Sequence, residues 1–562
     1  MKIAPVAFLL ALSACKHAPA AAPDRGSIEK SNENAQVLLE VAARFAPEQA
    51  ARLGVPGLDD RISDFTPGHR QRQRQALREA LARLQQKKEE DPMVAEDLEI
   101  LVAAAKRQIR GSELSEKYEV PYTNLPRLVF GNVRSLLDVQ VAPERRPAAL
   151  ERVRKYAGVV ALAEDETRAG LAQASLLPPS RLEVEEDLRT APFLIDGVEK
   201  LFKQFEIPGH VEPVAKLKAQ LAQYVEFVRA EVLPRARDDF RLPPELYAFR
   251  LEQFGVDIPP AELATRAHAA FAQYQSEMNT VAARLGFDDY RKAIRELKKQ
   301  QIPDGEVLAH YQKRLADIEQ IIREHRLVSL PGRAARIRLG TPAENAQQPA
   351  PHMVPPRLLG NTGEQGEFVL PLGIPGAAEM KYDDFNYSAA SWTLTAHEAR
   401  PGHELQFDGM VERGVSIARA IFAGNSANTE GWGLYAEAIT LPYMPDDGKL
   451  ISLQLRLQRA ARAFVDPELQ LGKWTPQDAR EFLQREVVLS PAFAKEEVDR
   501  FTFRAPGQAT SYFYGYTRLL ELRAEVEKKL GANFDAQRFH DLILAQGLLP
   551  PDLLRRAVLS AL

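Results

Sequence analysis

The chain has 562 residues, of which 45% are hydrophobic and 27% are charged, and this is enough for a large buried core. The 73 Lys and Arg residues nearly balance the 77 Asp and Glu residues, giving a formal net charge of −4. This balance excludes the strongly basic composition typical of nucleic-acid-binding proteins, so no nucleic-acid partner is expected.

The N-terminus is typical of an exported lipoprotein. Met1-Lys2 supplies a positive start, and residues 6–12 form an apolar run that is too short to span a bilayer. The run ends in Leu12-Ser13-Ala14-Cys15, which resembles a signal box cleaved before the cysteine. Cys15 is the only cysteine, so it cannot form an internal disulfide, whereas lipid attachment would use it. A plain secretory leader cleaved nearby is the alternative.

The leader also predicts where the protein resides. Residues 1–15 are expected to be a lipoprotein signal peptide, and residues 16–33, rich in Ala, Pro, Ser and Asn, a flexible tether. Lys16 follows the cysteine, as in lipoproteins sorted to the outer membrane. We therefore expect a protein of the bacterial cell envelope, anchored by lipid on the periplasmic side of the outer membrane. No later apolar run has the length of a membrane helix, so the lipid would be the membrane attachment.

Residues 34–330 are expected to form an N-terminal helical region. Apolar residues recur there at steps of three and four, as in Leu217, Leu221, Tyr224, Val225 and Val228, which precede Pro234. Residues 70–87 and 97–109 follow the same pattern, with charged faces that are expected to be solvated. Pro243-Pro244 and Pro259-Pro260 mark two further helix starts.

A small β element is predicted at the start of a C-terminal region that spans residues 331–562. Residues 335–339 alternate between polar and apolar types, and residues 367–372 form a second extended run, with Gly and Pro between the two. An exposed edge of this element could pair with an extended peptide. A structural hairpin packed on the helices would explain the same pattern equally well.

The segment His397-Glu398-Ala399-Arg400-Pro401-Gly402-His403 places two imidazoles and a carboxylate within seven residues. Glu430 follows on a later helical segment, so the chain offers two His and one Glu. These are the ligands of a catalytic zinc site that keeps a fourth position open for water. His397, His403 and Glu430 are therefore the candidate Zn²⁺ ligands.

The spacing of the two histidines differs from the usual H-E-x-x-H motif. Six residues turn a regular helix by about 600°, so the imidazoles of an unbroken helix would point apart. Pro401 interrupts the helix, and Gly402 allows conformations that other residues avoid. We expect a kink or bulge that returns His403 to His397. Two ordinary histidines flanking a helix break, with Glu398 and Glu430 as solvated charges, explain these residues equally well.

Two further carboxylates have predicted roles beside this site. Glu398 is next to a ligand without being one, and it could take a proton from the attacking water as a general base. Glu437 lies seven residues after Glu430 and shares its helix face, so it could accept a hydrogen bond from an imidazole. A carboxylate on the helix surface is the alternative for Glu437.

HEARPGHELQ at residues 397–406, followed by EGWGLYAE at residues 430–437, resembles the bacterial domain of unknown function 885 family. Members share an HE-x-x-PGH-x-x-Q core and a downstream EGW-x-x-Y-x-E. The likeness continues through residues 506–512, 539–541 and 547–550 and covers most of the chain beyond the leader. That family in turn resembles helical zinc metallopeptidases. Glu404 is a departure, because many relatives have a second His at this position.

The resemblance implies a fold and an activity. The fold would be mainly α and metallopeptidase-like, with two lobes, a deep cleft and the small β element before the metal helix. The activity would be zinc-dependent hydrolysis of short peptides. Tyr512, which matches the family pattern, would donate a hydrogen bond to the oxyanion, or it is a core aromatic. Arg500 and Arg504 are candidates for binding a substrate carboxylate.

Two other functions fit the same residues. One is a non-catalytic lipoprotein that binds peptides or partners and holds a structural metal. The other is a metal-dependent amidase acting on a substrate that is not a peptide.

Overall fold

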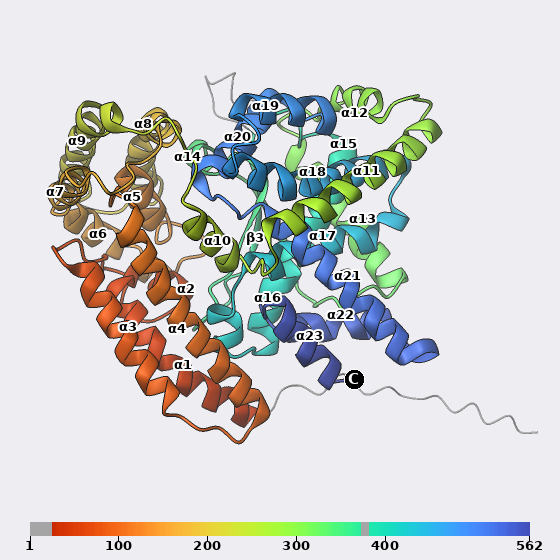
Figure 1. Ribbon diagram of the computed structural model, residues 1–562, viewed down its shortest axis with the longest axis horizontal. Helices are drawn as coiled ribbons and strands as arrows, with labels where there is room; N and C mark the ends of the chain where they lie inside the picture. The colour runs from red at the N-terminus through yellow and green to blue at the C-terminus, as the bar shows by residue number, and fades with distance from the viewer. Residues whose placement is uncertain (1–24, 373–381) are drawn as a thin grey trace, which may run out of the picture.

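The computed structural model describes residues 25–372 and 382–562, and most of these residues lie in helices (Figure 1). The prediction of a mainly α fold with a small β element is confirmed. The expected signal peptide with Cys15, and the tether residues 16–24, lie outside the described residues. In the part that is described, no helix is both long enough and apolar enough to cross a membrane.

The first four helices pack against one another along one side of the molecule. They are α1 (Arg25–Phe45), α2 (Pro47–Leu53), α3 (His69–Gln85) and α4 (Pro92–Tyr118). The prediction of a tether is wrong for residues 25–33, which form the first turns of α1. The buried side chains of Ser27 and Ser31 donate hydrogen bonds to Asp91 and Asp97. These tertiary contacts stabilise a helix in a segment whose composition is typical of a linker.

A second group of helices has a hydrophobic core of its own, which contains Phe130, Phe202 and Tyr224. Its members are α5 (Leu125–Arg134), α6 (Ala148–Tyr156), α7 (Val160–Leu171), α8 (Arg181–Gln204) and α9 (Val211–Phe227). The next four helices are α10 (Pro244–Gln253), α11 (Pro260–Arg284), α12 (Tyr290–Lys298) and α13 (Val307–Glu324). The helix starts predicted at Pro244 and Pro260 are confirmed.

Three short strands form the β element, with α14 (Pro342–Gln347) between the first two. β1 (Arg336–Leu339) pairs in parallel with β3 (Glu367–Leu370), and β2 (His352–Val354) pairs antiparallel with the other side of β3. The two predicted strands are thus confirmed, whereas the sequence patterns missed β2. Because the order is β1-β3-β2, β2 is an edge strand of this sheet.

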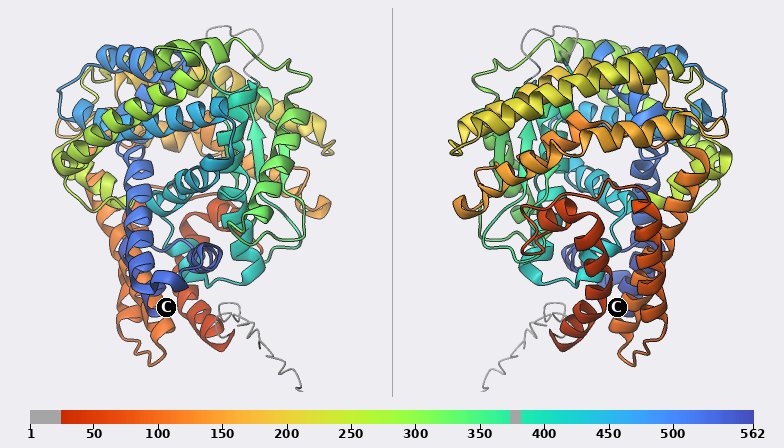
Figure 2. Two further views of the ribbon diagram at one scale, coloured as in Figure 1. Left: turned by 90° about the vertical axis from the view of Figure 1, so that its right-hand side faces the viewer. Right: turned by 90° about the vertical axis from the view of Figure 1, so that its left-hand side faces the viewer.

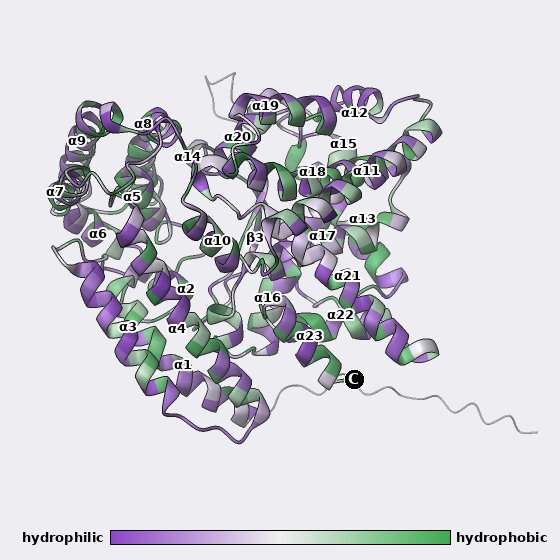
Figure 3. Ribbon diagram, viewed as in Figure 1, coloured by the Kyte–Doolittle hydropathy of each residue, from purple (hydrophilic) through white to green (hydrophobic). Residues whose placement is uncertain are grey.

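The remaining helices include α18, which is buried along most of its length. They are α15 (Ser388–Glu398), α16 (His403–Arg413), α17 (Ser426–Thr440), α18 (Asp446–Gln470), α19 (Pro476–Phe482), α20 (Pro491–Asp499), α21 (Thr510–Leu530), α22 (Ala536–Ala545) and α23 (Pro551–Ser560). Many outer helices combine hydrophilic and hydrophobic residues, as the amphipathic patterns predict (Figure 3).

The hydrophobic core extends across the expected boundary at residue 330. One cluster joins Phe271 of α11 to Phe464 of α18, and another joins Leu38 of α1 to Val526 of α21. Figure 2 shows the first helices, in red, near the last ones, in dark blue. The N-terminal helices therefore help to support the C-terminal region in which the candidate site lies.

Candidate metal centre

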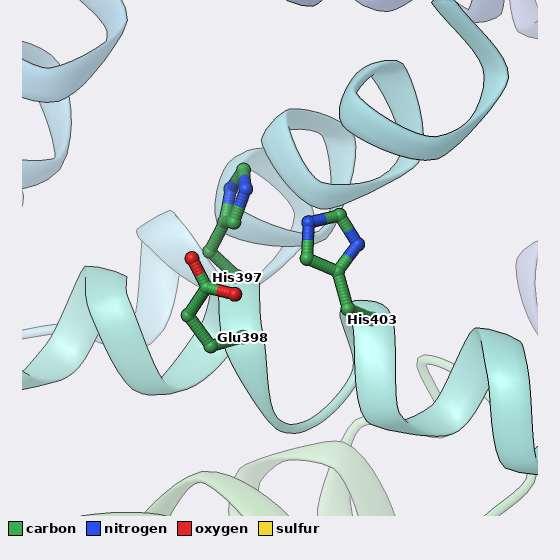
Figure 4. A group of neighbouring side chains, drawn as sticks. All are labelled: His397, Glu398 and His403. Carbon is green, nitrogen blue, oxygen red and sulfur yellow. The ribbon is translucent and has the colours of Figure 1, made fainter. Parts of the chain in front are cut away.

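The segment from His397 to His403 ends one helix and begins the next. α15 ends at Glu398 and α16 begins at His403, and the Arg400–Pro401 peptide between them is cis. The two imidazole centroids lie 4.6 Å apart, with the rings nearly perpendicular at 84° (Figure 4). The chain thus returns His403 to His397, through a complete helix break and not through a bulge within one helix.

The backbone of this junction is tightly packed. A Cβ atom added to Gly402 would lie 1.8 Å from the carbonyl oxygen of His397, so a side chain cannot be accommodated there. The indole Nε1 of Trp432, on α17, donates a hydrogen bond to the carbonyl oxygen of Pro401 at 2.9 Å. The Pro-Gly pair and the Trp of the two sequence motifs therefore shape and hold the same loop.

Arg400 also holds the loop in place, through contacts other than those of Trp432. Its fully buried guanidinium donates hydrogen bonds to Glu404 at 2.8 Å and to Glu319, on α13, at 2.6 Å. Glu404 is itself buried and also forms an ion pair with Arg333. The residue that departs from the family pattern therefore has a clear structural role beside the histidines.

Glu430, on α17, completes a triangle of potential ligand atoms. Its Oε2 lies 3.5 Å from His397 Nε2 and 3.4 Å from His403 Nε2. Ligands about 2.0–2.1 Å from a tetrahedral zinc ion are roughly 3.4 Å from one another. This oxygen is also buried without a hydrogen-bond partner among the described residues. The types and spacing of these atoms, together with the unsatisfied Glu430 oxygen, fit a divalent metal such as Zn²⁺.

Glu398 lies beside the same group (Figure 4). Ligand atoms of His397, Glu398 and His403 all lie within 4.8 Å of one another, so two carboxylates border the imidazoles. Glu430 is the better third ligand because one of its oxygens approaches both Nε2 atoms. Burial raises the pKa of Glu398 despite the opposing effect of the two imidazoles, and a base with a raised pKa suits proton transfer near neutral pH.

Glu437 orients His397, as its position in the sequence predicts. His397 Nδ1 donates to Glu437 Oε1 at 2.7 Å, and Thr393 donates to the other oxygen of this fully buried carboxylate. The contact assigns the proton to Nδ1 and leaves Nε2 facing Glu430. Burial lowers the pKa of His397, but its contacts with Glu430 and Glu437 outweigh this effect and raise the pKa to about 9.

Tyr512 is placed beside His397 by a close crossing of α17 and α21. A Cβ on Gly515 would lie 1.8 Å from the carbonyl oxygen of Ala427, so this crossing requires glycine. The Tyr512 ring stacks on the His397 ring, with 6.2 Å between centroids and 16° between planes. Burial and the charge of Glu430 raise the pKa of Tyr512, which keeps its hydroxyl protonated as a donor.

The site opens into a cavity of about 250 Å³. The side chains in its wall come from residues 348–512, and they include the candidate ligands, Glu398, Tyr512 and apolar residues such as Phe385, Leu394, Phe407 and Phe493. His352 and Met353 of the edge strand β2 form part of the same wall. A substrate in the cavity would therefore contact both the edge strand and the metal centre.

The two arginines proposed as a substrate clamp are separated in the structure. Arg500 lines this cavity, whereas Arg504 lines another one and forms an ion pair with Glu186 at 2.8 Å. Both belong to the π-helical turn η8 (Arg500–Arg504), and its geometry directs them to different cavities. The prediction that they act together is therefore wrong.

Sequence reasoning missed two other arginines, Arg459 and Arg462 of α18. Both line the cavity and are almost completely buried, with 6% and 3% exposure. Arginines three residues apart on a helix are usually on a face that is exposed to solvent, so their spacing alone predicts a solvated face. The composition of α18 gives no signal against that interpretation, because polar and charged residues are mixed with apolar ones along the helix, and only the structure shows that this face is buried.

Comparison with known structures identifies two similar proteins, both described as “putative lipoprotein”. The protein from Colwellia psychrerythraea is 18% identical, with a TM-score of 0.80, over 95% of this chain and 99% of that chain. The protein from Shewanella oneidensis is 19% identical, with a TM-score of 0.70, over the same shares. An M32 carboxypeptidase from Deinococcus radiodurans R1 aligns at 12% identity over 95% of this chain and 94% of that chain, but its TM-score of 0.39 is too low to establish a shared fold.

No match was found among curated proteins. A family model described as “Bacterial protein of unknown function (DUF885)” matches residues 47–558, which is nearly the whole described chain. The match includes both motifs that build the metal centre. The chain belongs to this DUF885 family of bacterial proteins.

Proposed function

We propose that this protein is a zinc-dependent metallopeptidase of the cell envelope that hydrolyses amide bonds in short peptides. The observation that carries the proposal is that Glu430 Oε2 lies 3.5 and 3.4 Å from Nε2 of His397 and of His403, with Glu398 beside the two imidazoles. A purely structural metal site needs ligands but has no use for a buried base next to an open cavity.

The residues divide the reaction between them. Zn²⁺, when bound, would polarise the scissile carbonyl and acidify water. Glu398 takes the proton from the attacking water and passes it to the leaving amine. Tyr512 donates a hydrogen bond to the developing oxyanion. Glu437 holds His397 in the tautomer that presents Nε2 to the site.

The edge strand β2 would align the substrate. An extended peptide can add to the free edge of a sheet through main-chain hydrogen bonds. His352 and Met353 of β2 line the cavity that contains the histidines, so a peptide paired there would pass in front of the metal centre. Peptides are therefore favoured over other amides, which lack a repeating backbone.

The anchoring of the protein belongs to the same proposal. Leu12-Ser13-Ala14-Cys15 has the form of a lipoprotein box, and the two similar structures are of proteins described as lipoproteins. Lipid on Cys15 would hold the enzyme on the periplasmic side of the outer membrane.

Metal analysis tests the centre. Purified protein should contain about one zinc per chain, and His397→Ala and His403→Ala should each lose most of it, because each removes one of three ligands. His325→Ala is the matched control, since His325 stacks on Tyr443 and is not in the cavity wall. Full zinc occupancy in His403→Ala would show that these residues do not form the site.

A further inference from the structure

Three arginines occupy the cavity wall next to the candidate metal centre. Arg459 and Arg462 project from α18, and Arg500 projects from η8. Arginine is rarely buried unless it is paired, so three guanidinium groups at one cavity need a structural or functional explanation.

The surrounding carboxylates satisfy these arginines only in part. Glu497 accepts two hydrogen bonds from Arg462, at 2.5 and 2.9 Å, but lies 3.7 Å from Arg500. Arg459 is 3.9 Å from Glu437, which is already engaged by His397. Among the described residues, the guanidinium groups of Arg459 and Arg500 therefore have no carboxylate oxygen within hydrogen-bond distance.

Several donor atoms of these arginines also lack a hydrogen-bond acceptor. Arg459 Nε and Arg462 Nη1 are buried without a hydrogen-bond partner among the described residues. The guanidinium of Arg500 has no hydrogen-bond partner among the described residues, and 15% of this side chain is exposed, at the cavity. Unsatisfied guanidinium groups facing a cavity are the complement of a carboxylate.

We infer that Arg459, Arg462 and Arg500 form a subsite for the C-terminal carboxylate of the substrate, which makes the protein a carboxypeptidase. This inference rests on the proposed peptidase function and specifies its substrate. Water supplies a hydroxyl group to the acyl carbon and a proton to the leaving amine, so no further reactant is needed.

The distances limit the length of the released fragment. The guanidinium of Arg462 lies 4.5 Å from the Tyr512 ring, whose centroid is 6.2 Å from that of His397. One extended peptide residue spans at most about 3.6 Å. The gap between the metal ligands and the arginines therefore accommodates one or two residues, which are released as an amino acid or a dipeptide.

Paired substrates test the subsite in the full-length, zinc-loaded protein. The probes are an N-acetylated tetra-alanine with a free C-terminal carboxylate and the same peptide with a C-terminal amide. We expect kcat/KM to be about 10–100-fold higher for the free acid, the scale of a hydrogen bond to a charged group. Mass spectrometry should find one or two residues removed from the C-terminus.

Variants assign this preference to the arginines. Arg500→Gln should lower kcat/KM for the acid about 10–100-fold more than kcat/KM for the amide, whereas a folding defect would lower both to the same extent. Arg500→Lys should retain part of the preference because it keeps the charge. Arg504→Gln changes the same helical turn but faces another cavity, so it should keep the ratio of the wild type. A third peptide, amidated but with an internal Glu, shows whether a side-chain carboxylate suffices, which would contradict C-terminal recognition.

Two results distinguish an incorrect assignment of the carboxylate subsite from an incorrect assignment of peptidase activity. Equal hydrolysis of acid and amide would refute the subsite and leave the peptidase intact. If neither peptide is hydrolysed, calorimetry with the zinc-loaded Glu398→Gln variant decides the question. Preferential binding of the acid, lost in Glu398→Gln/Arg500→Gln, would support the subsite without the peptidase activity, and equal binding of both peptides would overturn it.

Discussion

Glu398 is buried and Glu430 is partly buried beside the two imidazoles, and their positions predict opposite consequences of the same substitution. Glu398→Gln keeps the shape of the side chain but removes the basic lone pair, so zinc content should be unchanged while hydrolysis falls by about 10²–10⁴-fold. Glu430→Gln replaces a ligand, so zinc affinity itself should fall. Chelator competition and peptide turnover, measured on both variants, separate the two roles. Wild-type turnover in Glu398→Gln would show that another group is the base.

At the residue scale, motif and composition predicted the three candidate ligands but not the residues around them. His397, His403 and Glu430 are recognisable because their types and order match a known kind of metal site. Arg459 and Arg462 are not recognisable, since three-residue spacing of arginines is also typical of a solvated helix face. Only the packing of α18 in the middle of the core distinguishes the two cases.

At the element scale, helix periodicity and the prolines predicted most helices, whereas the short strand β2 was missed. A three-residue strand has too few positions to show alternation, and its partner β3 is separated from it by a loop. Pro401 predicted a kink or bulge in the helix, but not that one helix would end at Glu398 and a second begin at His403. The extent of this break depends on Glu319 and Trp432, which reach the loop from other helices.

His540 of helix α22 forms hydrogen bonds to two segments that are distant in the sequence, the chain after α13 and helix α17. Its Nδ1 donates to the carbonyl oxygen of Leu327 at 2.6 Å, and its Nε2 accepts from the hydroxyl of Tyr435 at 2.8 Å. Burial lowers the pKa of His540 to about 4, although the hydrogen bond to Leu327 acts in the opposite direction. The folded state therefore holds this imidazole neutral, while the unfolded chain binds a proton below about pH 6.5.

The sign of the resulting pH dependence follows from this difference. The contribution of His540 to stability is fully present above pH 6.5 and is lost as the pH falls from about 6.5 to about 4, by up to about 3 kcal/mol. Urea unfolding at pH 7.5, 6 and 5 should show this loss in the wild type and a smaller one in His540→Gln. Equal pH dependence in both proteins would mean that His540 is not held neutral.

For the whole molecule, attachment by a single lipid makes a clear prediction. With its own leader, the protein should sediment with the outer membrane and incorporate a palmitate analogue. Cys15→Ser should remain exported but move to the soluble periplasmic fraction, because the variant lacks the thiol that would carry the lipid. Membrane association that persists in Cys15→Ser would require a different anchor. Lys2→Arg, which keeps the positive start, is a matched control.

The contacts of Arg400 and Pro401 have a consequence for evolution and for protein engineering. The seven residues from His397 to His403 owe their conformation to side chains on α13 and α17, together with Arg333 ahead of the sheet. Grafting this segment onto an unrelated pair of helices would therefore not transfer the site, because its supports would stay behind. The candidate metal centre therefore depends on the intact chain. Related proteins are expected to keep this loop together with its supporting residues and to vary in the residues around it.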